Sequence, residues 1–138
     1  MKYFFVRCLH AIIGRGVVFA HCDIPCGIYT TEQAITAART VEVMVEKIQQ
    51  ANDDAHAIAR YAATKERWAQ ICKDELCILW ADFFKEEHLQ SNPNLHTVLW
   101  KAVKLCSSNK REVNTELAKD LRTAVEEVDA LFQAVQSS

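Results

Sequence analysis

The chain has 138 residues, a length expected to form one compact domain with no room for a second catalytic one. Half of the residues are hydrophobic and a quarter are charged, but no apolar run reaches the ~20 residues of a membrane span. The net charge of −2 is too balanced for a protein that grips nucleic acid through its phosphates. Three Gly and two Pro are too few for the turns of an all-β fold, so a few long helices are expected.

Residues 1–20 differ from the rest of the chain in charge. They contain three basic residues and no acidic one, whereas residues 21–138 carry a net charge of −5. The segment is apolar, is interrupted by Arg7 and Arg15, and carries the small residues Val18 and Ala20 at the two positions before the expected cut that processing enzymes commonly read. We therefore expect a leader that is removed on maturation, which leaves a single domain of residues 21–138. The alternative is that residues 1–20 form the first helix or strand of the domain.

The next segment, residues 21–29, carries the strongest turn signal in the chain. Pro25 fixes its own φ and disfavours a helical conformation in the residue before it. Gly27, the only glycine after residue 16, permits a positive φ. These two residues predict a tight hook. Cys22 and Cys26 lie near its ends, and their spacing alone allows a disulfide, a metal chelate or neither.

Beyond residue 30, apolar residues recur at the 3-and-4 spacing of helix faces. The pattern predicts helices over about residues 31–50, 55–87, 93–106 and 115–136, the second of them unbroken and unusually long. Four amphipathic helices with short connections predict an all-α, antiparallel four-helix bundle with an N-terminal metal-binding hook.

Helix-start signals set these boundaries. Thr30 and Gln33 form a capping-box pattern before the first helix, and residues 52–54 supply a turn and an N-cap for the second. Asn92 followed by Pro93 opens the third helix, and Asn114 caps the fourth.

The helices carry no recognisable catalytic or metal motif of their own. The helical histidines lack a Glu three residues before them, so the Glu-x-x-His pair of di-iron bundles is absent, as are a Gly-x-Ser-x-Gly elbow and a Gly-rich phosphate loop. Cys72, Cys77 and Cys106 stand singly in helical patterns and are expected to be buried as small hydrophobes.

A cut after Ala20 would place a complete ligand set in the hook. His21 would supply its free amine and its imidazole, Cys22 its amide nitrogen and thiolate, and Cys26 a second thiolate. Two nitrogens and two thiolates form a square-planar set that suits Ni(II) or Cu(II). Structural zinc would more usually recruit two separated pairs of side chains, and only one pair is present here.

The hook residues 21–29, H-C-D-I-P-C-G-I-Y, resemble the H-C-x-x-P-C-G-x-Y signature of the nickel superoxide dismutases. Residues 79–85, 88–89 and 93–96 also resemble the middle helices of that family. The resemblance implies a four-helix bundle that converts superoxide to oxygen and hydrogen peroxide by Ni(II)/Ni(III) cycling. It further implies one nickel ion per chain, a protease that cuts before His21, and assembly into a homohexamer.

Carried onto this chain, the resemblance implies that His21, Cys22 and Cys26 bind nickel. Tyr29 would stand over the open axial side of the metal, order water and limit access to small anions, while backbone amides near Asp23 help to place superoxide. The source of the protons stays open between water ordered by Tyr29 and a protonated thiolate.

The chain departs from the family pattern where the axial imidazole is held. Ala37 stands where a Glu is expected, and either Arg67 or Trp68 occupies the place of an Arg. Phe83 replaces a tyrosine that lines the channel in some members.

Two charged residues lie beside Phe83. Asp82 and Lys85 are expected to be helix-surface charges, although Lys85 would attract an anion locally.

Two alternatives remain at the level of sequence. The hook is expected to be the site of a superoxide dismutase, but it could also be a non-enzymatic nickel or copper chelator, or a redox-sensing dithiol, on a structural bundle. The unpaired helical cysteines favour the cytoplasm, with export as the alternative.

Overall fold

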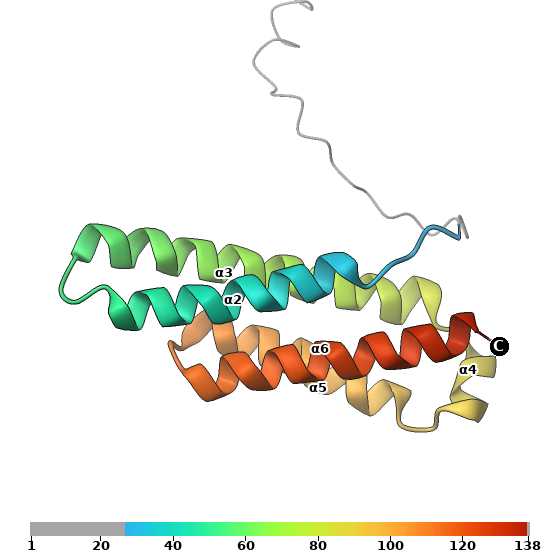
Figure 1. The fold of residues 1–138 in the computed structure, drawn as a ribbon. Helices are drawn as coiled ribbons and strands as arrows, with labels where there is room; N and C mark the ends of the chain where they lie inside the picture. Colours follow the sequence, from blue (N-terminus) through green and yellow to red (C-terminus); the bar gives the residue numbers. More distant parts are fainter. Residues whose placement is uncertain (1–26, 138) are drawn as a thin grey trace, which may run out of the picture.

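The computed structural model describes residues 27–137. Its elements are α2 (Glu32–Gln50), α3 (Ala55–Ile78), a π-helix η1 (Leu79–Phe83), α4 (Glu86–Ser91), α5 (Leu95–Arg111) and α6 (Thr115–Gln136). The four long helices α2, α3, α5 and α6 lie side by side and alternate in direction, while the short α4 lies at the end of the bundle near the C-terminus (Figure 1). The predicted antiparallel four-helix bundle is confirmed. In residues 27–137, no helix is both long and apolar enough to cross a membrane.

The core runs the length of the bundle and consists of the predicted apolar faces. Helix α2 packs against α3 and α6, and α5 packs against the same two helices, so each long helix buries one stripe against two neighbours. The α2 face is built mainly from small residues, which permit close approach of its neighbours. The fully buried residues of this face are Ala34, Ala37, Ala38, Val41 and Val45.

Two of the predicted N-caps are confirmed. The Asp54 side chain accepts a hydrogen bond from the Ala57 backbone N–H at 3.0 Å. The Asn114 side chain accepts from the N–H groups of Glu116 at 2.9 Å and Leu117 at 3.2 Å. Each carboxylate or amide oxygen therefore satisfies N–H groups that the first helical turn leaves without a partner.

The other two predicted helix starts are wrong by one or two residues. Thr31, not Thr30, is the residue that precedes α2, and it makes no side-chain cap; its hydroxyl donates instead to Asp129 of α6. Helix α5 is preceded by Asn94, and Asn92 and Pro93 belong to the connection before it. The Thr30 hydroxyl still accepts a hydrogen bond from the Glu32 backbone N–H at 3.2 Å, so a local bond to the first turn of α2 is present one residue before the N-cap position.

The prediction of one unbroken helix over residues 55–87 is also wrong. The chain widens into the π-helix η1, where the Phe84 N–H donates to the Leu79 carbonyl at 3.0 Å, and then becomes extended at Phe84 and Lys85. Phe84 is buried, and the Phe83 ring lies 4.5 Å from Phe132 of α6 between ring centroids. Residues 79–85 contain neither Gly nor Pro, so the packing of Phe83 and Phe84 at the end of the bundle accounts for the break in the helix.

The helical cysteines do not share one environment. Cys72 and Cys106 are buried as expected, and Cys72 donates a weak hydrogen bond to the Ala34 carbonyl at 3.7 Å. Hydrogen bonding to Cys106 and burial both raise the pKa of the Cys72 thiol. Cys77 is exposed, which contradicts its expected burial, because five residues of helix rotate it away from the face that carries Cys72.

A buried lysine stabilises the C-terminal end of α5. The Lys65 side chain is only 2% exposed, and burial lowers its pKa, an effect that Glu66 partly offsets. Its ammonium group donates to the carbonyls of Asn109, of Lys110 at 3.3 Å and of Glu112 at 2.9 Å. A positive charge at these carbonyls complements the negative end of the helix dipole.

We expect Lys65→Met to lower the free energy of unfolding by about 1–3 kcal/mol, because it leaves buried carbonyl oxygens at the end of α5 without their donor. Urea denaturation of the full chain measures the change. The control is Lys119→Met, whose side chain is half exposed and pairs with Glu116 at 3.1 Å, where a change below about 0.5 kcal/mol is expected. Equal losses in the two variants would contradict the capping role of Lys65.

Candidate metal centre

One of the predicted site residues lies within the described part of the chain. Tyr29 is described, whereas His21, Cys22, Asp23 and Cys26 fall outside residues 27–137, as does the predicted leader. The structure therefore describes the residues that follow the predicted hook and the part of the bundle that they contact. Within residues 27–137, no three His, Cys, Asp or Glu side chains are grouped so that they could hold a metal ion.

Gly27 begins the described chain in a conformation that fits a sharp turn directly after Cys26. Its φ is +71°, the left-handed region that glycine adopts without a steric penalty. A Cβ at this position would meet no atom within 4 Å, so the backbone conformation rather than the available space favours glycine. Residues 27–29 are not helical, in agreement with the predicted hook. A turn of this kind suits two cysteines and an N-terminal residue that must converge on one ion.

Tyr29 anchors the end of the hook in the bundle. It is 9% exposed, in contrast to Ile28, which is 72% exposed, and its ring centroid lies 5.7 Å from that of Phe83. Two residues later, the buried Thr31 hydroxyl donates to Asp129 Oδ1 of α6 at 2.5 Å. An aromatic contact to η1 and a charge-assisted hydrogen bond to α6 thus fix the path of the chain from the hook into α2.

A cavity of about 300 Å³ opens beside Tyr29. It lies between the end of the hook, the η1–α4 turn and the last turn of α6. Its lining residues are Gly27, Tyr29, Asp82, Phe83, Lys85, His88, Val135 and Gln136.

The two charges expected on a helix surface both border this cavity. Asp82 lies in η1 and Lys85 in the extended turn that follows, and both are exposed. Lys85 Nζ is 3.8 Å from Glu87 Oε1, but both side chains are about two-thirds exposed, so the pair is weak. Lys85 therefore leaves a positive group at the edge of the cavity that borders Tyr29.

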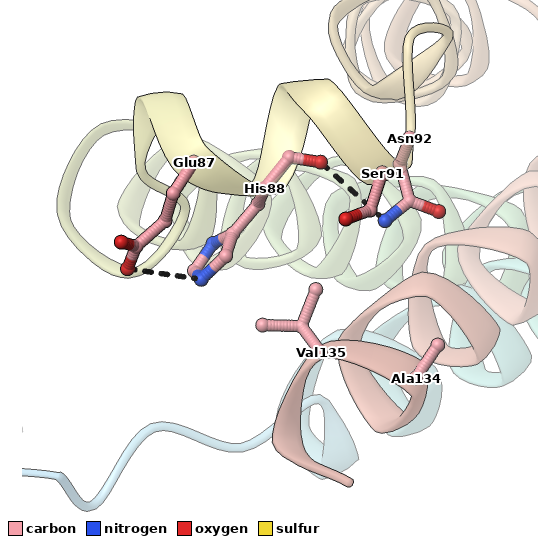
Figure 2. A pocket seen from close by; sticks show the side chains of 6 residues that line it. All are labelled: Glu87, His88, Ser91, Asn92, Ala134 and Val135. Atoms are coloured by element: carbon pink, nitrogen blue, oxygen red, sulfur yellow. Dashed lines mark hydrogen bonds and ion pairs between the residues drawn. The ribbon is translucent and has the colours of Figure 1, made fainter. Parts of the chain in front are cut away.

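Sequence reasoning missed His88. It lines the cavity beside Tyr29 and also a second cavity of about 550 Å³, where Val135 of α6 points toward α4 (Figure 2). Lys85 stands three residues before His88 in the sequence. The pair is not the Glu-x-x-His motif of a metal site, but its spacing is that of an N-cap residue and the third residue of a helix. That signal becomes readable only once a helix start at residue 86 is known.

The residues expected near the imidazole of His21 do not form a polar pair. Ala37 is fully buried on α2 and has no hydrogen-bonding side chain. Arg67 is exposed on α3, whereas Trp68 is half buried and packs against the core. Trp68 borders a hollow of about 290 Å³ together with residues of the first turn of α2. The structure thus places an apolar pair, Ala37 and Trp68, on the inner face of this part of the bundle.

Comparison with known proteins identifies one family. The family model for nickel-containing superoxide dismutase matches residues 16–136. The nickel superoxide dismutase of Streptomyces seoulensis is 38% identical over 115 residues, which cover 83% of this chain and 87% of the relative. The enzyme of Streptomyces coelicolor is 33% identical over the same coverage.

Solved structures give the same result. A crystal structure of nickel-containing superoxide dismutase with nickel ligation corresponding to the oxidized state aligns with a TM-score of 0.81 at 36% identity, covering 86% of this chain and all of that one. A native nickel superoxide dismutase structure aligns with a TM-score of 0.80 at 30% identity and the same coverage. The likeness thus extends over most of the bundle.

We expect Thr31→Val to detach the start of α2 from α6. Loss of a hydrogen bond to a charged acceptor should lower the free energy of unfolding by about 1.5–3 kcal/mol and speed amide exchange in the first turn of α2. The control is Thr40→Val, because the Thr40 hydroxyl bonds only within its own helix, to the Thr36 carbonyl at 2.8 Å. If both variants changed exchange at Ile35 equally, the Thr31–Asp129 contact would not be the anchor.

Proposed function

The chain belongs to the nickel-containing superoxide dismutase family, and from this premise we propose that His21, Cys22 and Cys26 bind its nickel once residues 1–20 are removed. The enzyme converts two superoxide anions and two protons to oxygen and hydrogen peroxide. The observation that carries the proposal is the join between hook and bundle: Gly27 in a left-handed turn, followed by the buried Tyr29, directly after the Cys22–Cys26 pair.

The donor set fits nickel in its chemistry. An amine, an amide nitrogen and two thiolates are electron-rich donors of the kind that suit nickel, and the His21 imidazole would supply a further nitrogen donor. Nickel held by these donors supplies the one-electron oxidation and reduction of superoxide. The amine is available only if His21 is the first residue, so maturation by a protease that cuts before it belongs to the proposal.

The residues around the cavity bind and admit the substrate in this proposal. Tyr29 is buried at the join of hook and bundle, where it orders water and restricts the opening to small anions, while backbone amides near Asp23 help to place superoxide. Lys85 at the cavity edge attracts the anion. Phe83 leaves this wall without the hydroxyl that a tyrosine would provide, so water beside Tyr29 is the nearer route for protons.

We further propose that the protein assembles into a homohexamer and acts in the cytoplasm. The family resemblance supports the hexamer. The reduced state of Cys72, Cys77 and Cys106 supports a reducing compartment.

We expect a chain that begins at His21 to bind about one nickel per chain and to dismutate superoxide, whereas the same chain with one Ala added before His21 should lose at least about 100-fold in activity. The added residue converts the terminal amine into an amide and displaces the imidazole. Stopped-flow or pulse-radiolysis rates with nickel analysis measure both effects.

The full 138-residue chain is the matched precursor and should be inactive when supplied with nickel. Equal nickel binding without dismutase activity in all three forms would overturn the proposed ligand set and favour a chelating or thiol-sensing hook.

A further inference from the structure

His88 occupies the partition between two cavities. It lies in α4 and borders both the cavity beside Tyr29 and the larger outer cavity, and Val135 of α6 is its neighbour in each. Its side chain is 18% exposed. Figure 2 shows the imidazole directed to the cavity side of α4, with Nε2 facing Glu87.

The hydrogen bonds of His88 hold the turn that carries Lys85. The imidazole Nδ1 accepts a hydrogen bond from the Lys85 backbone N–H at 3.1 Å, and the His88 backbone N–H donates to the Lys85 carbonyl at 3.0 Å. The imidazole ring also packs against Phe83, at 6.0 Å between centroids, and against Phe84, at 6.2 Å. One side chain therefore fixes the backbone of Lys85 and supports the aromatic wall of the cavity beside Tyr29.

The short helix α4 depends on this arrangement. It has six residues, too few for a stable helix on its own, and none of them is fully buried; Leu89 is the α4 residue that packs, partly buried, against the core. The reciprocal bonds between Lys85 and His88 satisfy N–H groups at its first turn. Loss of the Nδ1 acceptor should therefore loosen α4 and the turn together.

We propose that His88 is a positioning residue for superoxide dismutation: its neutral imidazole holds the Lys85 turn against the substrate cavity, and protonation of Nδ1 releases that turn. This inference rests on the proposed placement of the nickel hook beside the cavity. Nδ1 can accept the Lys85 N–H only while it carries no proton. The competent form is thus the one with an unprotonated Nδ1, and positioning is lost when acid protonates that nitrogen.

Charged groups face His88 from the elements packed against it. Glu87 of α4 places Oε1 3.7 Å from Nε2, and Asp82 of η1 borders the cavity beside Tyr29 together with His88. Lys85 lies at the edge of that cavity, whereas the α6 residues that face His88, Val135 and Gln136, carry no charge. Tyr29 completes the ionisable groups of the cavity beside the hook. A proton on Nδ1 removes the acceptor of the Lys85 backbone N–H.

The test uses three substitutions at His88. His88→Asn places an oxygen where Nδ1 lies and does not titrate, so it should keep activity at neutral pH within about threefold of wild type and lose the acid decline that His88 causes. His88→Phe keeps ring packing without an acceptor, and His88→Gln places its amide at the Nε2 position. Both should lower kcat/KM about tenfold at neutral pH with unchanged nickel content, as expected for a lost helix cap, and the difference from wild type should shrink in acid, where wild type also loses the Nδ1 acceptor.

A second readout does not depend on nickel. In the metal-free 138-residue chain, amide exchange at Lys85, followed by NMR, should accelerate as the pH falls, beyond the intrinsic pH dependence, in wild type but not in His88→Asn.

His96→Asn is the matched control. His96 also accepts a hydrogen bond through Nδ1, from Trp80 Nε1 at 2.8 Å, but it lies on α5 away from the cavity beside Tyr29. This variant should behave as wild type in both readouts.

Two results would overturn the role of His88: the same acid decline in His88→Asn as in wild type at constant nickel content, or full activity with normal Lys85 protection in His88→Phe. Failure of the nickel-site proposal would appear instead as absent nickel or activity in wild type that begins at His21, while the exchange result at Lys85 would stand.

Discussion

Burial of Tyr29 is the constraint on which the position of the site depends. Residues 27–31 link the predicted hook to the bundle, and Gly27 permits a turn there that few other residues tolerate. The entry of the chain into the bundle is held by the Tyr29–Phe83 contact and by the hydrogen bond from the Thr31 hydroxyl to Asp129. Both partners belong to other elements, η1 and α6. The bundle therefore acts as the rigid support that a short metal-binding segment requires.

The break between η1 and α4 lies at the end of the bundle that Tyr29 contacts. An unbroken helix would carry Lys85 and His88 along the α3 axis and away from the hook. The π-helix and the extended Phe84 turn the chain instead across the end of the bundle, where Phe83 meets Phe132. The aromatic contacts are apolar and close, whereas the polar groups of the turn stay at the rim of the cavity. Packing thus decides which polar side chains border the candidate site.

Sequence periodicity predicted the bundle because its faces depend on local spacing. The Asp54 and Asn114 caps were predictable for the same reason, since each bonds to N–H groups two or three residues away. The hook ligands were readable because their chemistry is concentrated in six consecutive residues. Gly27 confirms the turn at its end, and the ligand residues themselves stay a prediction.

The features that sequence reasoning missed depend on partners distant in the chain. Thr31 bonds to Asp129, 98 residues away, a contact that the local pattern of Thr30 and Gln33 does not reveal. Phe84 and Phe83 break a helix that has no Gly or Pro, because their burial against α6 outweighs continued helical hydrogen bonding. Lys65 is buried among carbonyls of α5, an arrangement that a charge pattern along one helix does not reveal. His88 becomes a cap only after the break has created a helix start.

The charge of residues 21–138, the proposed mature domain, affects how an anionic substrate is attracted. Residues 21–138 carry a net charge of −5, so the overall field repels superoxide, and attraction must come from groups near the site. At physiological ionic strength the screening length is about 8 Å, so one cation at the cavity edge governs the field there more than distant carboxylates do. Lys85 is that cation, and Glu87, at 3.8 Å, offsets part of its charge. The ion pair between Lys85 and Glu87 is exposed and weak, so it does not fix the Lys85 ammonium group. The backbone at Lys85 therefore determines how near this group stays to the cavity, and the hydrogen bond to His88 holds that backbone.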